Sequence, residues 1–264
     1  MSKRLWKCIL LAAVCIAATL AQAAPIGAVV MHGKGGGPTR LVADLAAALR
    51  ARGYLVANLE MPWSGQRHYD VDVATAEQET ERALAGLRAQ GADKVFIIGH
   101  SQGGLFALHL GGTHKVDGIV AIAPGGNVAG ALLREKTGAS LAQARSLLAE
   151  GKGDTITTLN DYEGARGSFA VQATPAHYVS WFDPDGAMNQ DKAVRAIAPG
   201  TPVLYIAPTG DYPALSRVNP ELFAALPHHP MNRFYTPSAT HKEAPSASVD
   251  EIVRWTGEVA GKAH

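Results

Sequence analysis

A serine, an aspartate and a histidine, which together can carry out acyl transfer, occur in that order along the chain. Ser101 lies in the stretch GHSQGG, Asp211 in PTGDYP and His241 in SATHKE. In this chemistry a histidine accepts the serine proton during nucleophilic attack, while a carboxylate fixes the imidazole tautomer and stabilises the imidazolium. We therefore take these three residues as candidates for the nucleophile, the acid and the general base.

The candidate nucleophile lies in a G-x-S-x-G pattern that spans residues 99–103. This pattern is typical of a sharp turn between a strand and a helix, at which the serine side chain is exposed. The flanking runs fit, because KVFIIG precedes the serine and LFALHL follows it. The alternative is an ordinary glycine-rich turn with a serine facing solvent. The presence of acid and base candidates later in the chain weakens that alternative.

Both partners of the serine also have simpler interpretations. Asp211 could be a turn residue, since Gly-Asp before an aromatic residue and proline is common turn composition. His241 is one of ten histidines, and its position directly after the last predicted strand favours it over the others. If Asp211 is not the acid, Asp183 and Asp185 are the next candidates.

Short β-branched runs alternate with helical patterns along the chain. Strands are predicted at 26–33, 54–61, 94–99, 118–124, 202–208 and 232–237. Helices are predicted at 39–53, with Leu41, Leu45 and Leu49 on its apolar face, at 73–91, at 102–112 and from Ser248, which forms a capping box with Glu251. The alternation predicts an α/β fold with a mostly parallel sheet that is covered by helices on both faces.

These motifs and their order resemble the α/β-hydrolase family, in the branch of dienelactone-hydrolase-like and small bacterial esterase-like proteins. The resemblance implies a serine hydrolase that cleaves a carboxylic ester and needs no cofactor and no metal. It also implies an oxyanion hole made by backbone N–H groups. One belongs to Gln102, and the other to Lys34 in HGKGGG, with Gly33 as the neighbouring alternative.

The stretch from about residue 125 to 200 separates two predicted strands and is longer than a simple connection. A second capping box, from Ser140 to Gln143, predicts the start of a new helix inside it. Family members often carry a cap here, so we expect a small cap that selects the substrate. Trp63, Tyr178 and Trp181 are the predicted substrate-binding residues, with Arg166 as a candidate anchor for an anionic group; packing in a second layer of core is the alternative for the aromatic residues.

Residues 1–23 have the pattern of a secretory signal peptide. Three basic residues are followed by an apolar run over 8–20 and by AQAA, in which Ala21 and Ala23 are spaced as a small-x-small cleavage site. The apolar run is shorter than the roughly 20 residues that span a membrane. We expect cleavage after Ala23, one mature domain of residues 24–264, a periplasmic or secreted location, and no stable membrane anchor.

Composition limits the partners of the mature chain. The only two cysteines of the sequence, Cys8 and Cys15, precede the predicted cleavage site, so we expect no disulfide in the mature chain. Without the three basic residues of the signal, 21 basic residues face 23 acidic ones, which is not the balance of a nucleic-acid-binding protein. We expect a small-molecule ester as the partner. The sequence leaves the oligomeric state open.

Two other functions fit the same residues. A thioesterase or an amidase would use the same triad on another acyl bond. A non-catalytic binding protein with the hydrolase fold is the alternative from a different class, because a fold alone does not determine function. Labelling by a fluorophosphonate probe would distinguish the catalytic functions from the non-catalytic one.

Overall fold

The computed structural model describes residues 24–261, and the predicted signal peptide lies outside this range. Its centre is a sheet of six parallel strands in the order β2-β1-β3-β4-β7-β8. The strands are β1 (Ile26–Met31), β2 (Leu55–Leu59), β3 (Lys94–His100), β4 (Gly118–Ile122), β7 (Val203–Ile206) and β8 (Arg233–Tyr235). All six coincide with the predicted strands.

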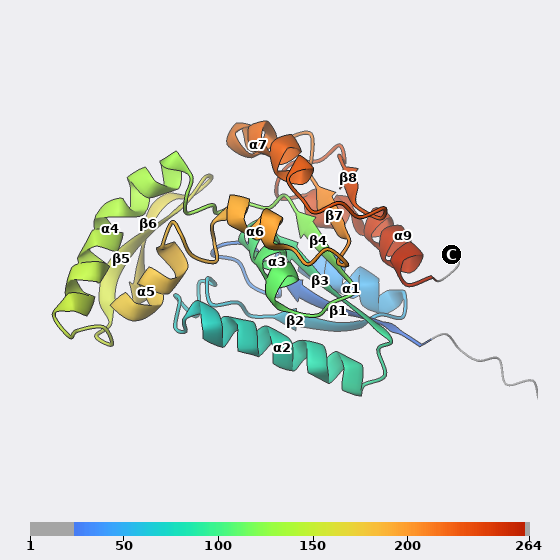
Figure 1. The fold of residues 1–264 in the computed structure, drawn as a ribbon, viewed down its shortest axis with the longest axis horizontal. Helices are drawn as coiled ribbons and strands as arrows, with labels where there is room; N and C mark the ends of the chain where they lie inside the picture. The colour runs from blue at the N-terminus through green and yellow to red at the C-terminus, as the bar shows by residue number, and fades with distance from the viewer. Residues whose placement is uncertain (1–23, 262–264) are drawn as a thin grey trace, which may run out of the picture.

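Helices cover both faces of the sheet (Figure 1). Side chains alternate along each strand, so Val29 and Met31 pack into one hydrophobic cluster while Ala28 and Val30 pack into the other. The principal helices are α1 (Ala43–Ala51), α2 (Val73–Ala89), α3 (Gln102–Thr113), α7 (Pro213–Ala224), α8 (Ala244–Ala247) and α9 (Val249–Val259). The larger cluster includes side chains of α2 and α3, and the smaller one includes those of α1 and α9. The predicted fold is confirmed.

Two details of the predicted helices are wrong. Helix α1 begins at Ala43, so Leu41 precedes it and is 45% exposed instead of lying on the buried face. Ser248 makes no capping hydrogen bond at the start of α9. The carboxylate of Glu251 instead forms ion pairs with Arg233 and Arg254, so the predicted capping box does not form.

The segment between β4 and β7 adds a layer of its own, visible at the left of Figure 1. It contains α4 (Ala131–Ala149), the antiparallel hairpin of β5 (Thr157–Glu163) and β6 (Gly167–Ala173), α5 (Pro175–Phe182) and α6 (Gln190–Ala196). Ser140 lies inside α4, where its hydroxyl accepts the N–H of Asn160 rather than capping a new helix. Helix α6 packs against α3, so the last part of the segment belongs to the body of the protein.

No helix within residues 24–261 is long and apolar enough to cross a membrane.

Candidate active site

The candidate residues lie where the strand order changes direction. From β1 the chain moves to β2 on one side and then returns to β3 on the other, which leaves a crevice between the ends of β1 and β3. The loops that follow these strands touch, because a Cβ added to Gly33 would lie 2.9 Å from the Cβ of Ser101. The topology therefore brings the predicted oxyanion loop against the predicted nucleophile.

Ser101 has the strained backbone expected of the turn. Its φ of 56° and ψ of −118° lie in a region that L-residues rarely adopt. A Cβ at Gly99 would lie 2.0 Å from the carbonyl oxygen of Gly103, and one at Gly103 would lie 2.7 Å from the carbonyl oxygen of His32. Both positions thus need glycine. The serine N–H donates to the carbonyl of Ile122 at 2.9 Å, which anchors the turn to the end of β4.

The serine, histidine and aspartate form one chain of hydrogen bonds. The hydroxyl of Ser101 lies 3.0 Å from Nε2 of His241, and Nδ1–H of His241 donates to Oδ1 of Asp211 at 2.7 Å. The side chains of Asp211 and His241 are almost fully buried. Their loops run side by side, since the N–H of Gly210 donates to the carbonyl of Ala239 at 2.9 Å. The structure thus brings together all three residues that the sequence singles out.

The histidine is held from two sides by residues that the sequence analysis does not select. His100 donates its Nε2–H to the carbonyl of His241 at 2.9 Å. Burial lowers the pKa of His100 to about 3, so this ring stays neutral near pH 7. The ring of Tyr212 stacks on the imidazole with centroids 4.5 Å apart, and its hydroxyl donates to Glu163 at 3.2 Å. In the sequence, the only signal for His100 and Tyr212 is that they are adjacent to Ser101 and Asp211.

The loop after β1 is held by a second buried histidine. His32 accepts the N–H of Met61 at Nε2 and donates Nδ1–H to the carbonyl of Gly33 at 2.7 Å. Burial lowers the pKa of His32, which agrees with a neutral ring that uses both nitrogen atoms. The N–H groups of Gly35 and Gly36 donate to backbone carbonyls.

The backbone N–H groups of the predicted oxyanion donors are free of acceptors in the described part of the chain. Within residues 24–261 no acceptor receives the N–H of Lys34 or that of Gln102. Lys34 lies in the loop that touches Ser101, and Gln102 is the first residue of α3. These are the two donors that the sequence analysis expects, with the N–H of Gly33 beside them.

An open cavity of about 860 Å³ leads to Ser101 and His241. Charged side chains of both signs line it, together with apolar groups. The lining includes Arg40, Leu41, Asp44, Glu163, Arg166, Phe169, Tyr212, Lys242 and Glu243.

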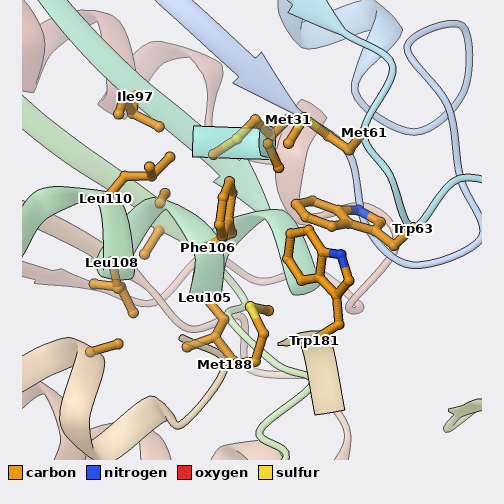
Figure 2. Packing of buried hydrophobic residues seen from close by; sticks show 14 of the residues in the cluster. Met31, Met61, Trp63, Ile97, Leu105, Phe106, Leu108, Leu110, Trp181 and Met188 are labelled. Atoms are coloured by element: carbon orange, nitrogen blue, oxygen red, sulfur yellow. The ribbon is translucent and has the colours of Figure 1, made fainter. Parts of the chain in front are cut away.

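The three aromatic residues expected to bind substrate do not line this cavity. Trp63, Tyr178 and Trp181 are 2%, 0% and 1% exposed. Figure 2 shows both indoles packed beside Phe106 of α3, with centroids of the two tryptophans 5.5 Å apart. Each polar atom is also satisfied internally, and Trp181 donates its indole N–H to the carbonyl of Val71. The structure corrects this assignment: these residues join the inserted segment to the core.

The sequence of residues 28–255 matches the model of the Alpha/beta hydrolase family. The chain belongs to the alpha/beta hydrolase family. No curated relative matches the chain. Among solved structures of similar fold, a monoacylglycerol lipase of Paleococcus ferrophilus has a TM-score of 0.62 at 22% identity, and the match covers 89% of this chain and 96% of the lipase.

Two further structures share the fold of this alpha/beta hydrolase. Est1E from Butyrivibrio proteoclasticus, solved with ferulic acid, has a TM-score of 0.61 at 14% identity over 90% of each chain. A thermostable carboxyl esterase from Bacillus coagulans has a TM-score of 0.57 at 16% identity, over 90% of this chain and 89% of the esterase. At these identities the likeness establishes the fold only.

Proposed function

We propose that this alpha/beta hydrolase is an exported esterase that cleaves a small carboxylic ester by acyl transfer through Ser101. The observation that carries the proposal is the unbroken relay from the Ser101 hydroxyl through His241 to Asp211, with distances of 3.0 and 2.7 Å. Relays of this kind convert a weakly nucleophilic hydroxyl into an attacking group. The solved structures of similar fold include esterases and a lipase, which agrees with this chemistry.

In the first half-reaction Ser101 Oγ attacks the carbonyl carbon while its proton passes to Nε2 of His241. The negative charge that develops on the carbonyl oxygen is accepted by the N–H groups of Gln102 and Lys34. When the bond to the alcohol breaks, His241 returns the proton to the leaving oxygen and the acyl group remains on the serine. Water then attacks the acyl-enzyme by the same route and restores the free serine.

A substrate profile of the purified protein tests the activity. We expect turnover of p-nitrophenyl esters, measured over increasing acyl length, with lower rates on a matched thioester and a matched anilide. A higher specificity constant on the thioester or the anilide would replace the esterase proposal by one of those activities. Absence of turnover on all three would favour a non-catalytic binding protein.

The export part of the proposal rests on the sequence of residues 1–23. We expect the protein recovered from the periplasm or the medium to begin at Ala24, since cleavage would follow the Ala-x-Ala pattern at residues 21–23. N-terminal sequencing of the exported protein checks this expectation. A protein that retains Met1 would contradict it.

Arg166 makes the mouth of the cavity favourable for esters that carry a negative charge. Its guanidinium lies over the ring of Phe169 at 3.9 Å, and one of its nitrogen atoms lies 3.5 Å from the position of a Cβ on Gly35. Two carboxylates that line the same cavity accept hydrogen bonds from backbone N–H groups. Glu163 accepts those of its own turn, and Glu243 accepts that of Thr240. No carboxylate within residues 24–261 forms an ion pair with Arg166.

Arg166→Gln should therefore lower the preference for an anionic ester over a neutral one of equal length. For p-nitrophenyl hemisuccinate against p-nitrophenyl valerate, we expect the ratio of kcat/KM values to fall about fivefold, the effect of roughly 1 kcal/mol from one exposed charge pair. Arg145→Gln is the matched control, since Arg145 pairs with Asp183 in the inserted segment and its loss removes the same charge. Equal ratios in the wild type and both variants would refute a role for Arg166.

A further inference from the structure

The inserted segment contributes a buried carboxylate that contacts the oxyanion loop. Asp161 of β5 is fully buried, and its Oδ1 lies 2.6 Å from the ammonium of Lys34. The lysine side chain is itself only 6% exposed and also donates to the carbonyl of Tyr162 at 3.0 Å. The residue whose N–H is a proposed oxyanion donor is thus tethered by its own side chain to the hairpin.

The other oxygen of the Asp161 carboxylate is linked to the second donor residue through Tyr69. The hydroxyl of Tyr69 donates to Oδ2 of Asp161 at 2.7 Å, and the side-chain amide of Gln102 lies 3.5 Å from that hydroxyl. Burial, followed by the charge of Asp161, raises the pKa of Tyr69, so the tyrosine keeps its proton. The side chains of both donor residues therefore converge on one Tyr–Asp pair.

The backbone around Tyr69 is strained at this contact. His68 and Tyr69 have φ values of 49° and 61°, which non-glycine residues seldom adopt. The N–H of Tyr69 donates to the carbonyl of Pro62 at 2.6 Å and so closes the loop that follows β2. This loop presents the tyrosine hydroxyl to the buried carboxylate.

Strand β5 presents a second carboxylate on the same side of the hairpin. Residues two apart on a strand share a face, so Asp161 and Glu163 both point toward the body of the protein. Glu163 accepts the hydroxyl of Tyr212, whose ring stacks on His241. One strand of the insertion thus contacts both the oxyanion loop and the support of the general base.

Stability alone is a poor explanation for the buried ion pair. Removing two charges from water is so unfavourable that apolar replacements of a buried pair are often neutral or stabilising. A buried pair can instead fix one geometry, and here the residues it fixes are those proposed as oxyanion donors.

We propose that Asp161 is a positioning residue for the oxyanion hole. Asp161 holds Lys34 directly and Gln102 through Tyr69, so that both backbone N–H groups point at the same oxyanion. The proposal rests on the esterase function proposed above and assigns part of the inserted segment to the chemical step. Because the oxyanion forms only in the transition state, loss of this positioning should affect kcat and not substrate binding.

The double variant Lys34→Met/Asp161→Asn tests the proposal. It removes both charges at once and leaves no unpaired buried ion, whereas Asp161→Asn alone would strand the ammonium of Lys34. We expect kcat on a p-nitrophenyl ester to fall about tenfold, less than the hundredfold or more for loss of a whole oxyanion donor. KM should stay within about twofold, and the Ki of a boronic acid that adds to Ser101 should rise in parallel with the loss of kcat.

Two further variants make the test decisive. Asp154→Asn makes the same chemical change at an exposed site of the insertion and should leave kcat and Ki at their wild-type values. Tyr69→Phe retains the packed ring and removes only the hydroxyl, so it should lower kcat about threefold with a matching rise in Ki.

Each outcome bears on the proposal. The positioning role would be overturned if the folded double variant had wild-type kcat and Ki. If the double variant does not fold, the same result in a folded Tyr69→Phe variant would overturn it. A loss that appears only in KM would overturn it as well. If the wild type hydrolyses no ester and takes no serine label, the proposed function fails, and the positioning role fails with it.

Discussion

Ser101→Ala should lower ester turnover by roughly four to six orders of magnitude, because the attacking oxygen is lost and only binding and the oxyanion hole remain. Alanine retains the Cβ of serine, so the contact with Gly33 and the strained turn are preserved. We therefore expect a melting temperature close to that of the wild type and an unchanged KM for any residual activity. Steady-state kinetics with stopped-assay detection of slow turnover measure the loss.

The melting temperature is the control for this variant. A folded Ser101→Ala protein that retained more than about one hundredth of wild-type turnover would show that another group attacks the ester.

His241→Ala should cause a loss of the same order, since no other described side chain within hydrogen-bond reach accepts the proton of Ser101. The double variant with Ser101→Ala should be no slower than either single variant, because the two residues act as one unit. Losses that multiply in the double variant would contradict a shared role.

The acid is tested by Asp211→Asn, which should cost somewhat less than loss of the serine or the histidine. Its folding needs a separate check, because Asp211 is buried and also accepts the N–H of Tyr212 at 2.7 Å. Nearly full activity in a folded Asp211→Asn protein would place the acid elsewhere. Asp183 and Asp185 are weak replacements, since they form exposed ion pairs with Arg145 and Lys192.

The sequence predicts the strands and the convergence of Ser101, Asp211 and His241 for a physical reason. In a parallel sheet the carboxyl ends of all strands lie at one edge, so residues that directly follow different strands meet there. Ser101, Asp211 and His241 each follow a predicted strand. Their convergence could therefore be expected although 140 residues separate the serine from the histidine.

The inserted segment was harder to predict because its role depends on contacts with no local signal. An apolar aromatic side chain can line a cavity or fill a core, and only the packing of Trp181 against Trp63 and Phe106 decides between them. The pairing of Lys34 with Asp161 spans 127 residues and follows no spacing rule. Likewise, the capping box at Ser140 is a pattern that the continuous helix α4 overrides.

The most direct test of the account is to label the purified wild-type protein with a fluorophosphonate and map the adduct by peptide mass spectrometry. We expect one adduct, on the peptide that contains Ser101, and none in the folded Ser101→Ala variant. An adduct on another residue, or an active protein that takes no label at Ser101, would contradict the assignment of this serine as the nucleophile.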